Sequence, residues 1–204
     1  MTPSPQDAPA AARRLRDHLF RWRGWSVIVL AAALLVWRWP LAPRVGPVLA
    51  ALPLVLLGVA LRLWARSYFT RGSDTRRIQA HRLIVCGPYR RVRNPLYVGN
   101  IAIAVGLALA FAGPWAAAAF LVALAALYSV VVRSEEAILA SSHGESYAEF
   151  CRRVPRWVPR LRALPADADA PAAALKHAAR KEAQRAAGAV GAWALALVIA
   201  CFVA

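Results

Sequence analysis

The chain has 204 residues, of which 60% are hydrophobic and 18% are charged, and its mean hydropathy is +0.45. Soluble domains average about 45–50% apolar and about 25% charged residues, so this composition disfavours a soluble globule. The 26 Lys and Arg residues against 10 Asp and Glu give a net charge of +16. Such a charge is typical of a nucleic-acid binder. In a chain with membrane-spanning blocks, however, the positive charges indicate which side of the membrane each loop faces. We therefore expect a membrane protein with no nucleic-acid partner.

Long apolar blocks indicate the membrane spans. A helix needs about 20 residues to cross about 30 Å of hydrocarbon. One uncharged block, residues 97–132, is too long for a single span, and the turn dipeptide Gly113-Pro114 near its middle predicts a tight helical hairpin. With this division the blocks predict four spans in the first two thirds of the chain, at about 25–41, 45–64, 97–112 and 115–132.

The rest of the chain divides around these spans. Residues 1–24 form a tail, and residues 25–160 form the transmembrane core. Residues 161–186 combine a Pro- and Asp-containing spacer with an Ala- and Lys-rich surface helix, and the apolar run 187–204 is the last span. The predicted fold class is all-α, a multi-pass transmembrane helical protein with about five spans. The sequence leaves its oligomeric state open.

The basic residues predict the orientation. All of them except Arg38 and Arg44 lie in the tail, near or after the end of the second span, or in the segment 133–186. The positive-inside rule places these segments, and the N-terminus with them, in the cytoplasm. Arg62, near the end of the second span, is placed to snorkel to the interface.

Two polar clusters flank the hairpin, and a hairpin returns the chain to the side that it left. The segment from His81 to Tyr97 leads into the third span, and Arg133-Ser-Glu-Glu136 leaves the fourth. Adjacent carboxylates at a span end need cationic partners, for which Arg91, Arg93 and Arg133 are nearest. Taken singly, these motifs are also compatible with ordinary turns and a solvated helix end. The three cysteines and four histidines match no zinc-ligand spacing, so we expect no metal.

The motifs of this region occur in a recognisable order. They are Gly87-Pro-Tyr-x-x-x-Arg-x-Pro-x-Tyr-x-Gly99, Arg133-x-Glu-Glu136, Gly144-x-x-Tyr147 and Val154-Pro-Arg-Trp-Val-Pro159. Together they resemble the isoprenylcysteine carboxyl methyltransferase and phospholipid methyltransferase family of integral-membrane enzymes, across about residues 81–160. The resemblance implies S-adenosylmethionine as the methyl donor, held at the cytoplasmic mouth of the helices. The chain has no Gly-x-Gly-x-x-Gly fingerprint of a Rossmann domain.

The resemblance also implies roles for individual residues. The donor-binding residues that it implies are His81, Arg82, Leu83, Ile84, Tyr89, Asn94, Pro95, Leu96, Tyr97 and Glu135. Arg133 lies close to the place of a substrate-binding arginine, and Arg133 and Glu136 are the candidate catalytic residues. Asn94 departs from the family, which typically has histidine there. Asparagine keeps a neutral hydrogen-bonding group, but it does not act as a titrating base.

The expected function is S-adenosylmethionine-dependent methylation of a lipid-borne or prenylated acceptor. Carboxyl O-methylation of an isoprenylcysteine is the leading expectation, because a carboxylate needs no general base. Phospholipid N-methylation of the phosphatidylethanolamine type is the alternative, and it requires removal of an amine proton. The residues of this region that could act as the base are Glu135, Glu136 and His81. A non-catalytic binding module on the same fold is the third hypothesis.

Overall fold

The computed structural model describes residues 45–68 and 83–165, together with the isolated residues 187, 191 and 194. Its elements are α2 (Val45–Arg66), the short 3-10 helix η1 (Gly87–Arg90), α4 (Pro95–Ala112) and α5 (Pro114–Arg153). In this part of the chain the structure is all-helical, and three helices are long and apolar enough to cross a membrane. The expected tail and the spans at 25–41 and 187–204 lie outside the described residues apart from those three positions, so the count of five spans stays a prediction.

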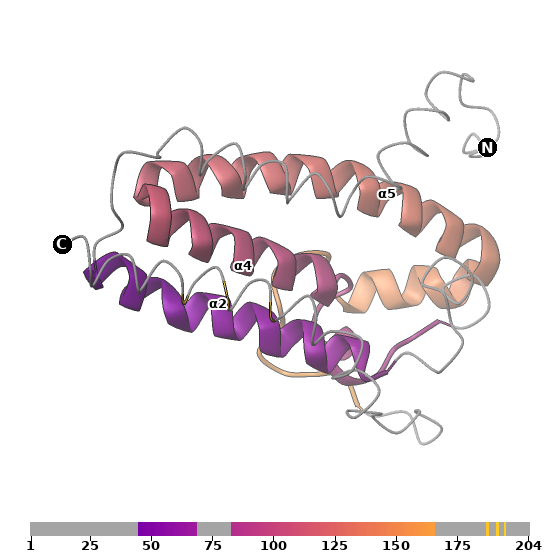
Figure 1. Ribbon diagram of the computed structural model, residues 1–204. Coiled ribbons are helices and arrows are strands. Elements are labelled where there is room, and N and C mark those ends of the chain that lie inside the picture. Colours follow the sequence, from indigo (N-terminus) through magenta and orange to yellow (C-terminus); the bar gives the residue numbers. More distant parts are fainter. Residues whose placement is uncertain (1–44, 69–82, 166–186, 188–190, 192–193, 195–204) are drawn as a thin grey trace.

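The predicted hairpin is present. Gly113 separates α4 from α5 in a backbone conformation with φ of +85°, which glycine adopts without steric cost. Pro114 follows as the first residue of α5, where its missing N–H leaves no helical bond unmade. Figure 1 shows α4 and α5 lying side by side from this turn. The local chemistry of the Gly-Pro dipeptide therefore reverses the chain where the sequence predicted.

α5 is longer than the span predicted at 115–132. It passes through the acidic pair without a break, because charged residues end an apolar stretch but do not end a helix. The helical path changes only at Gly144, whose φ of +51° and ψ of −125° are not helical. After this kink the last turns of α5 fold back toward the start of α4 (Figure 1). Here Tyr147, Phe150 and Val154 form a small apolar cluster.

Small residues let α2 and α4 approach closely. A Cβ atom added to Gly58 would lie 2.7 Å from the carbonyl oxygen of Gly99, and one added to Gly106 would lie 2.7 Å from Cγ2 of Val55. Close backbone approach of this kind is typical of helix pairs in membranes. Gly99, Gly106 and Gly113 recur every seven residues; the first two lie at this helix contact, whereas Gly113 makes the turn.

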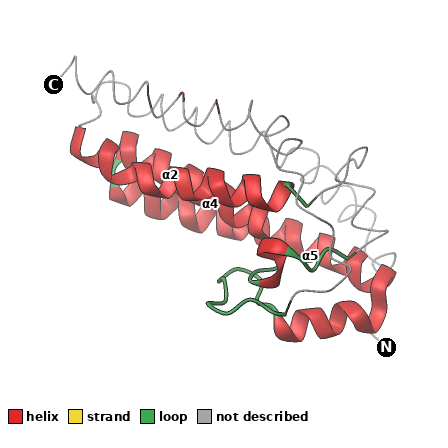
Figure 2. Ribbon diagram, turned by 90° about the horizontal axis from the view of Figure 1, so that it is seen from below, coloured by secondary structure: helices red, strands yellow, loops and turns green. Residues whose placement is uncertain are grey.

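The contact between α4 and α5 uses larger side chains from α5. Phe120, Leu124 and Tyr128 of α5 are buried against Ala104 and Ala108 of α4. In the view of Figure 2 the described loops gather at the end of the helices remote from the hairpin turn. The polar motifs lie at this end, so the fold brings together what the sequence separates by the length of two spans.

Candidate functional site

Backbone hydrogen bonds join the chain after α5 to the chain before α4. The N–H of Arg93 donates to the carbonyl of Pro155 at 2.9 Å, and the N–H of Arg160 donates to the carbonyl of Arg91 at 2.9 Å. The N–H of Leu164 donates to the carbonyl of Arg90 at 3.2 Å. These bonds fix the Val154–Pro159 motif beside the motif that precedes α4.

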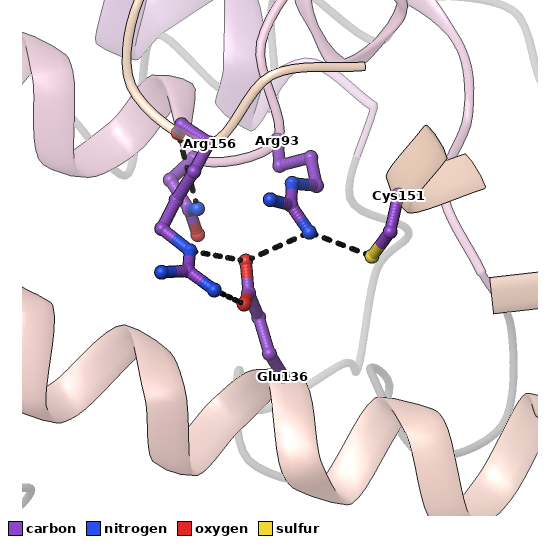
Figure 3. A network of polar contacts seen from close by, with 5 residues as sticks. Arg93, Glu136, Cys151 and Arg156 are labelled. Atoms are coloured by element: carbon purple, nitrogen blue, oxygen red, sulfur yellow. Dashed lines mark hydrogen bonds and ion pairs between the residues drawn. The ribbon is translucent and has the colours of Figure 1, made fainter. Parts of the chain in front are cut away.

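Glu136 is held between two guanidinium groups (Figure 3). Arg156 donates from Nε to Oε1 at 3.1 Å and from Nη2 to Oε2 at 2.6 Å, and Nη1 of Arg93 lies 3.3 Å from Oε1. The Glu136 and Arg93 side chains are only 12% and 14% exposed. The hydrogen bond to Glu136 raises the pKa of Arg156, which stays a cation. The negative charge of Glu136 is therefore compensated by two guanidinium groups, of which that of Arg156 also donates hydrogen bonds to its oxygens.

Further contacts connect this cluster to its surroundings. Nη1 of Arg93 also donates to Sγ of Cys151 at 2.6 Å (Figure 3). Nδ2 of Asn94 donates to the carbonyl oxygen of Arg156 at 3.3 Å. Asn94 thus acts through its amide donor, as a neutral residue. Of the three arginines predicted as partners of the acidic pair, Arg93 contacts Glu136, whereas Arg91 donates to the backbone carbonyls of Arg160 and Leu161. Sequence reasoning missed Arg156, for which the Val-Pro-Arg motif was the available signal.

Glu135 points to a different environment from Glu136. It is 8% exposed, and its Oε1 accepts a hydrogen bond of 2.7 Å from the hydroxyl of Tyr97. The Tyr97 ring packs against the Tyr128 ring with centroids 4.8 Å apart. Neighbouring helix positions differ by about 100° around the axis, so one carboxylate meets the loop arginines while the other meets the aromatic side chains of α4 and α5.

The phenol of Tyr89 interacts electrostatically with the carboxylate of Glu135. Burial raises the pKa of its phenol, with smaller influences from Arg66, Glu135, Cys86 and Arg62. The phenol therefore stays protonated at neutral pH. It packs with Ala65, Ile84 and Leu96, two of which are among the residues that the family resemblance implies. The sequence-predicted residues Tyr89, Tyr97 and Glu135 thus belong to one region.

The other predicted site residues are distributed around this region or away from it. Pro95 is buried in the first turn of α4, and Leu83 packs against the apolar cluster at the end of α5. Arg133 is exposed on α5, about 200° around the helix from Glu135. The structure does not bring Arg133 to the other site residues, and its role in the reaction stays a prediction. His81 and Arg82 lie outside the described residues.

A polar connection deeper in the bundle was not predicted. Nη1 of Arg62 in α2 donates to Oδ1 of Asn100 in α4, and Nδ2 of Asn100 donates to the hydroxyl of Tyr128 in α5 at 3.3 Å. Arg62, which was expected to snorkel to the interface, is half-buried, and its stem packs against Gly99. The signal for Asn100 was its amide group within an otherwise apolar span, a position where polar residues are costly.

Comparison with known proteins identifies relatives of two kinds. A sequence profile described as phospholipid methyltransferase matches residues 47–146. The chain is 36% identical over 169 residues to the cobalt-zinc-cadmium resistance protein CzcN of Cupriavidus metallidurans, covering 78% of this chain and 73% of that protein. It is 34% identical over 116 residues to the nickel-cobalt-cadmium resistance protein NccN of Alcaligenes xylosoxydans xylosoxydans, covering 55% of this chain and 51% of the relative.

A eukaryotic enzyme is also similar. The chain is 32% identical over 112 residues to protein-S-isoprenylcysteine O-methyltransferase B of Arabidopsis thaliana, covering 53% of this chain and 57% of that protein. No solved structure matches. The segment that the profile matches contains the turn between α4 and α5 and the acidic pair.

Proposed function

We propose a specific reaction for this chain, which belongs to the isoprenylcysteine carboxyl and phospholipid methyltransferase family of integral-membrane enzymes. As a member of this family it is a methyltransferase. The proposed reaction is methyl transfer from S-adenosylmethionine to the carboxylate of a lipid-borne acceptor of the isoprenylcysteine kind.

The chemistry of the site residues fits the donor. A buried carboxylate such as Glu135 accepts hydrogen bonds from ribose hydroxyls or from an ammonium group. The rings of Tyr89 and Tyr97 offer faces to a sulfonium cation. We assign the donor site to these three residues with Ile84 and Leu96, which pack around Tyr89. His81 and Arg82 are proposed to complete it.

The choice of acceptor is supported by one observation: both carboxylates of the acidic pair already bind other side chains of the protein. Glu136 is bound by Arg93 and Arg156, and Glu135 accepts from Tyr97. Because oxygens of both carboxylates already accept hydrogen bonds from these donors, we assign neither residue as the base that would remove an amine proton. Phospholipid N-methylation would therefore depend on His81 for its base.

A carboxylate acceptor needs no base, because it has no proton to lose before methyl transfer. When bound, S-adenosylmethionine supplies a methyl carbon to an acceptor oxygen, and the new C–O bond forms as the C–S bond breaks, leaving a methyl ester and a neutral thioether with no proton to remove. The protein then has to orient the two reactants and exclude water. We propose that the arginine-held segment after α5 helps to exclude water, because Arg156 ties it to Glu136.

We further propose that residues 25–160 form the catalytic core and that its polar end faces the cytoplasm. The distribution of basic residues supports this orientation. The donor would then enter from water, and the acceptor from the bilayer.

The test uses the purified full-length protein with radiolabelled donor. One reaction contains a farnesylcysteine analogue with a free carboxylate, and a second contains vesicles of phosphatidylethanolamine. We expect label in the first product, released as methanol by mild base, since esters hydrolyse and methylated amines do not. Base-stable label in phosphatidylethanolamine would establish the alternative reaction. Donor binding without transfer to either would favour a non-catalytic binding module.

A further inference from the structure

We propose that the loop 157–162, which follows α5, binds the anionic phospholipids of the membrane surface. Its exposed apolar side chains enter the membrane interface, and its exposed arginines meet the headgroup phosphates. The inference goes beyond the proposed function, because it concerns an interaction surface and holds whichever acceptor is methylated. It depends on insertion of the helices in a membrane, for which α2, α4 and α5 are long and apolar enough.

The hydrogen bonds of the loop fix its level relative to the spans. The N–H of Arg160 donates to the carbonyl of Arg91, four residues before α4 begins at Pro95. The 18 residues of α4 extend about 27 Å, close to the roughly 30 Å of the hydrocarbon layer. The start of α4 therefore lies near the boundary of this layer, and so does the loop. Figure 1 shows the segment after α5, in orange, passing behind α4 and α2 near the start of α4.

An exposed tryptophan of α2 marks the same level. Gly58 of α2 approaches Gly99 of α4. Val55, earlier in α2, lies against Gly106, later in α4, so the two helices are antiparallel. Trp64, near the end of α2, therefore lies near the start of α4, and its side chain is exposed. Because tryptophan is enriched at membrane–water interfaces, this residue supports an interface at the polar end of the helices.

The loop is held at its backbone while two of its apolar side chains stand out. Trp157 packs against the apolar cluster between α4 and α5, and Nη1 of Arg91 donates to the carbonyl oxygen of Leu161 at 2.5 Å. The residues Val158 and Leu161 are nevertheless 74% and 94% exposed. Such side chains gain free energy by entering an apolar phase, and the membrane boundary beside the loop supplies one.

The charge of the loop region matches an anionic surface. Residues 150–165 contain five arginines and no Asp or Glu. Three of these arginines form ion pairs with glutamates of α5. Arg160 donates instead to the carbonyl oxygen of Arg153 at 2.6 Å, and Arg162 is exposed; within the described residues neither forms an ion pair. Basic residues beside exposed apolar side chains are typical of segments that bind anionic lipid.

The experiment identifies what the loop touches in a membrane. The photocrosslinking residue p-benzoylphenylalanine is placed at Leu161 of the full-length protein, which is reconstituted in nanodiscs of phosphatidylcholine mixed with phosphatidylglycerol. After irradiation, mass spectrometry identifies the adducts. Val122, exposed in the apolar part of α5, provides the lipid-facing comparison. Glu145 lies roughly 45 Å along α5 from its start, beyond the hydrocarbon layer, and provides the water-facing comparison.

We expect lipid adducts at Leu161 in a yield comparable to that at Val122 and well above that at Glu145. Phosphatidylglycerol should be over-represented among the adducts at Leu161. Each arginine near an anionic surface should contribute a preference of about fivefold.

Matched pairs of variants test the role of the arginines. Arg160→Gln combined with Arg162→Gln should abolish the excess of phosphatidylglycerol, because the loop loses both cations. Arg152→Gln combined with Arg153→Gln removes the same charge from arginines that are paired with glutamates, and it should preserve the excess.

Several outcomes would overturn the inference. A yield at Leu161 as low as that at Glu145 would show that the loop faces water. Equal labelling of the two lipids, or an excess that both pairs of variants affect equally, would remove the arginines from lipid recognition. Adducts to a second copy of the chain would make the loop a protein interface. If the protein labelled at Leu161 does not fold, the same measurement at Val158 decides the question. Because no readout requires methyl transfer, this inference and the proposed function can fail separately.

Discussion

Glu135→Gln removes the charge from a carboxylate that is 8% exposed while preserving its size. The carboxylate already accepts a bond of 2.7 Å from Tyr97, so its position depends little on the donor molecule. A charge-assisted hydrogen bond at such a site contributes about 1.5–3 kcal/mol. Since about 1.4 kcal/mol corresponds to a tenfold change in affinity, we expect donor affinity to fall roughly ten- to a hundredfold.

The assay is equilibrium binding of S-adenosylmethionine to detergent-solubilised protein, with thermal unfolding measured in parallel. Tyr97→Phe removes the hydroxyl that orients Glu135 and completes a double-mutant cycle. Because the two residues are in contact, the effects on donor affinity should not be additive, with a coupling of about 0.5–3 kcal/mol. An exposed acidic residue, Glu145, whose side chain is 81% exposed, provides the matched control as Glu145→Gln.

Three results would contradict this reasoning. Unchanged donor affinity in a folded Glu135→Gln protein would remove the carboxylate from the donor site. Strict additivity with Tyr97→Phe would show that the hydroxyl does not act through Glu135. A loss of affinity accompanied by an equal loss in Glu145→Gln would indicate a general effect of charge.

Three other predictions concern the segment after α5, the packing of α2 against α4, and the orientation in the membrane. Glu136→Gln should accelerate tryptic cleavage in the segment after α5, because the two guanidinium groups lose their shared anion; unchanged cleavage would mean that the backbone bonds suffice. Gly106→Leu should lower the melting temperature, since even its Cβ would lie 2.7 Å from Val55, whereas a Cβ at Gly46 meets nothing within 4 Å and Gly46→Leu should leave the melting temperature unchanged. A reporter inserted at Gly113 should be external and one fused after residue 165 cytoplasmic; the reverse at either point would contradict the proposed orientation.

Local sequence determined the helical part of the fold. The apolar blocks specify spans by length and composition, and Gly113-Pro114 specifies the hairpin, because positive φ and a missing N–H are properties of those residues themselves. Once the hairpin is predicted, the meeting of the two polar clusters follows from geometry, and the need of the acidic residues for an arginine partner follows from charge, with Arg93 as one of three candidates. These inferences needed no knowledge of packing between helices.

The tertiary structure decided which charged residues meet. Adjacent glutamates receive different partners because helix phase turns Glu136 to the loop and Glu135 to Tyr97. After the kink at Gly144 the end of α5 folds back, which places Arg156 beside Glu136, and the close approach at Gly99 lets the stem of Arg62 pack against α4. Hydropathy averages over all sides of a helix, so it places an arginine along the chain but not toward a neighbour. The direction of a side chain depends on the distance and rotation of the helices around it, and only the assembled bundle determines these.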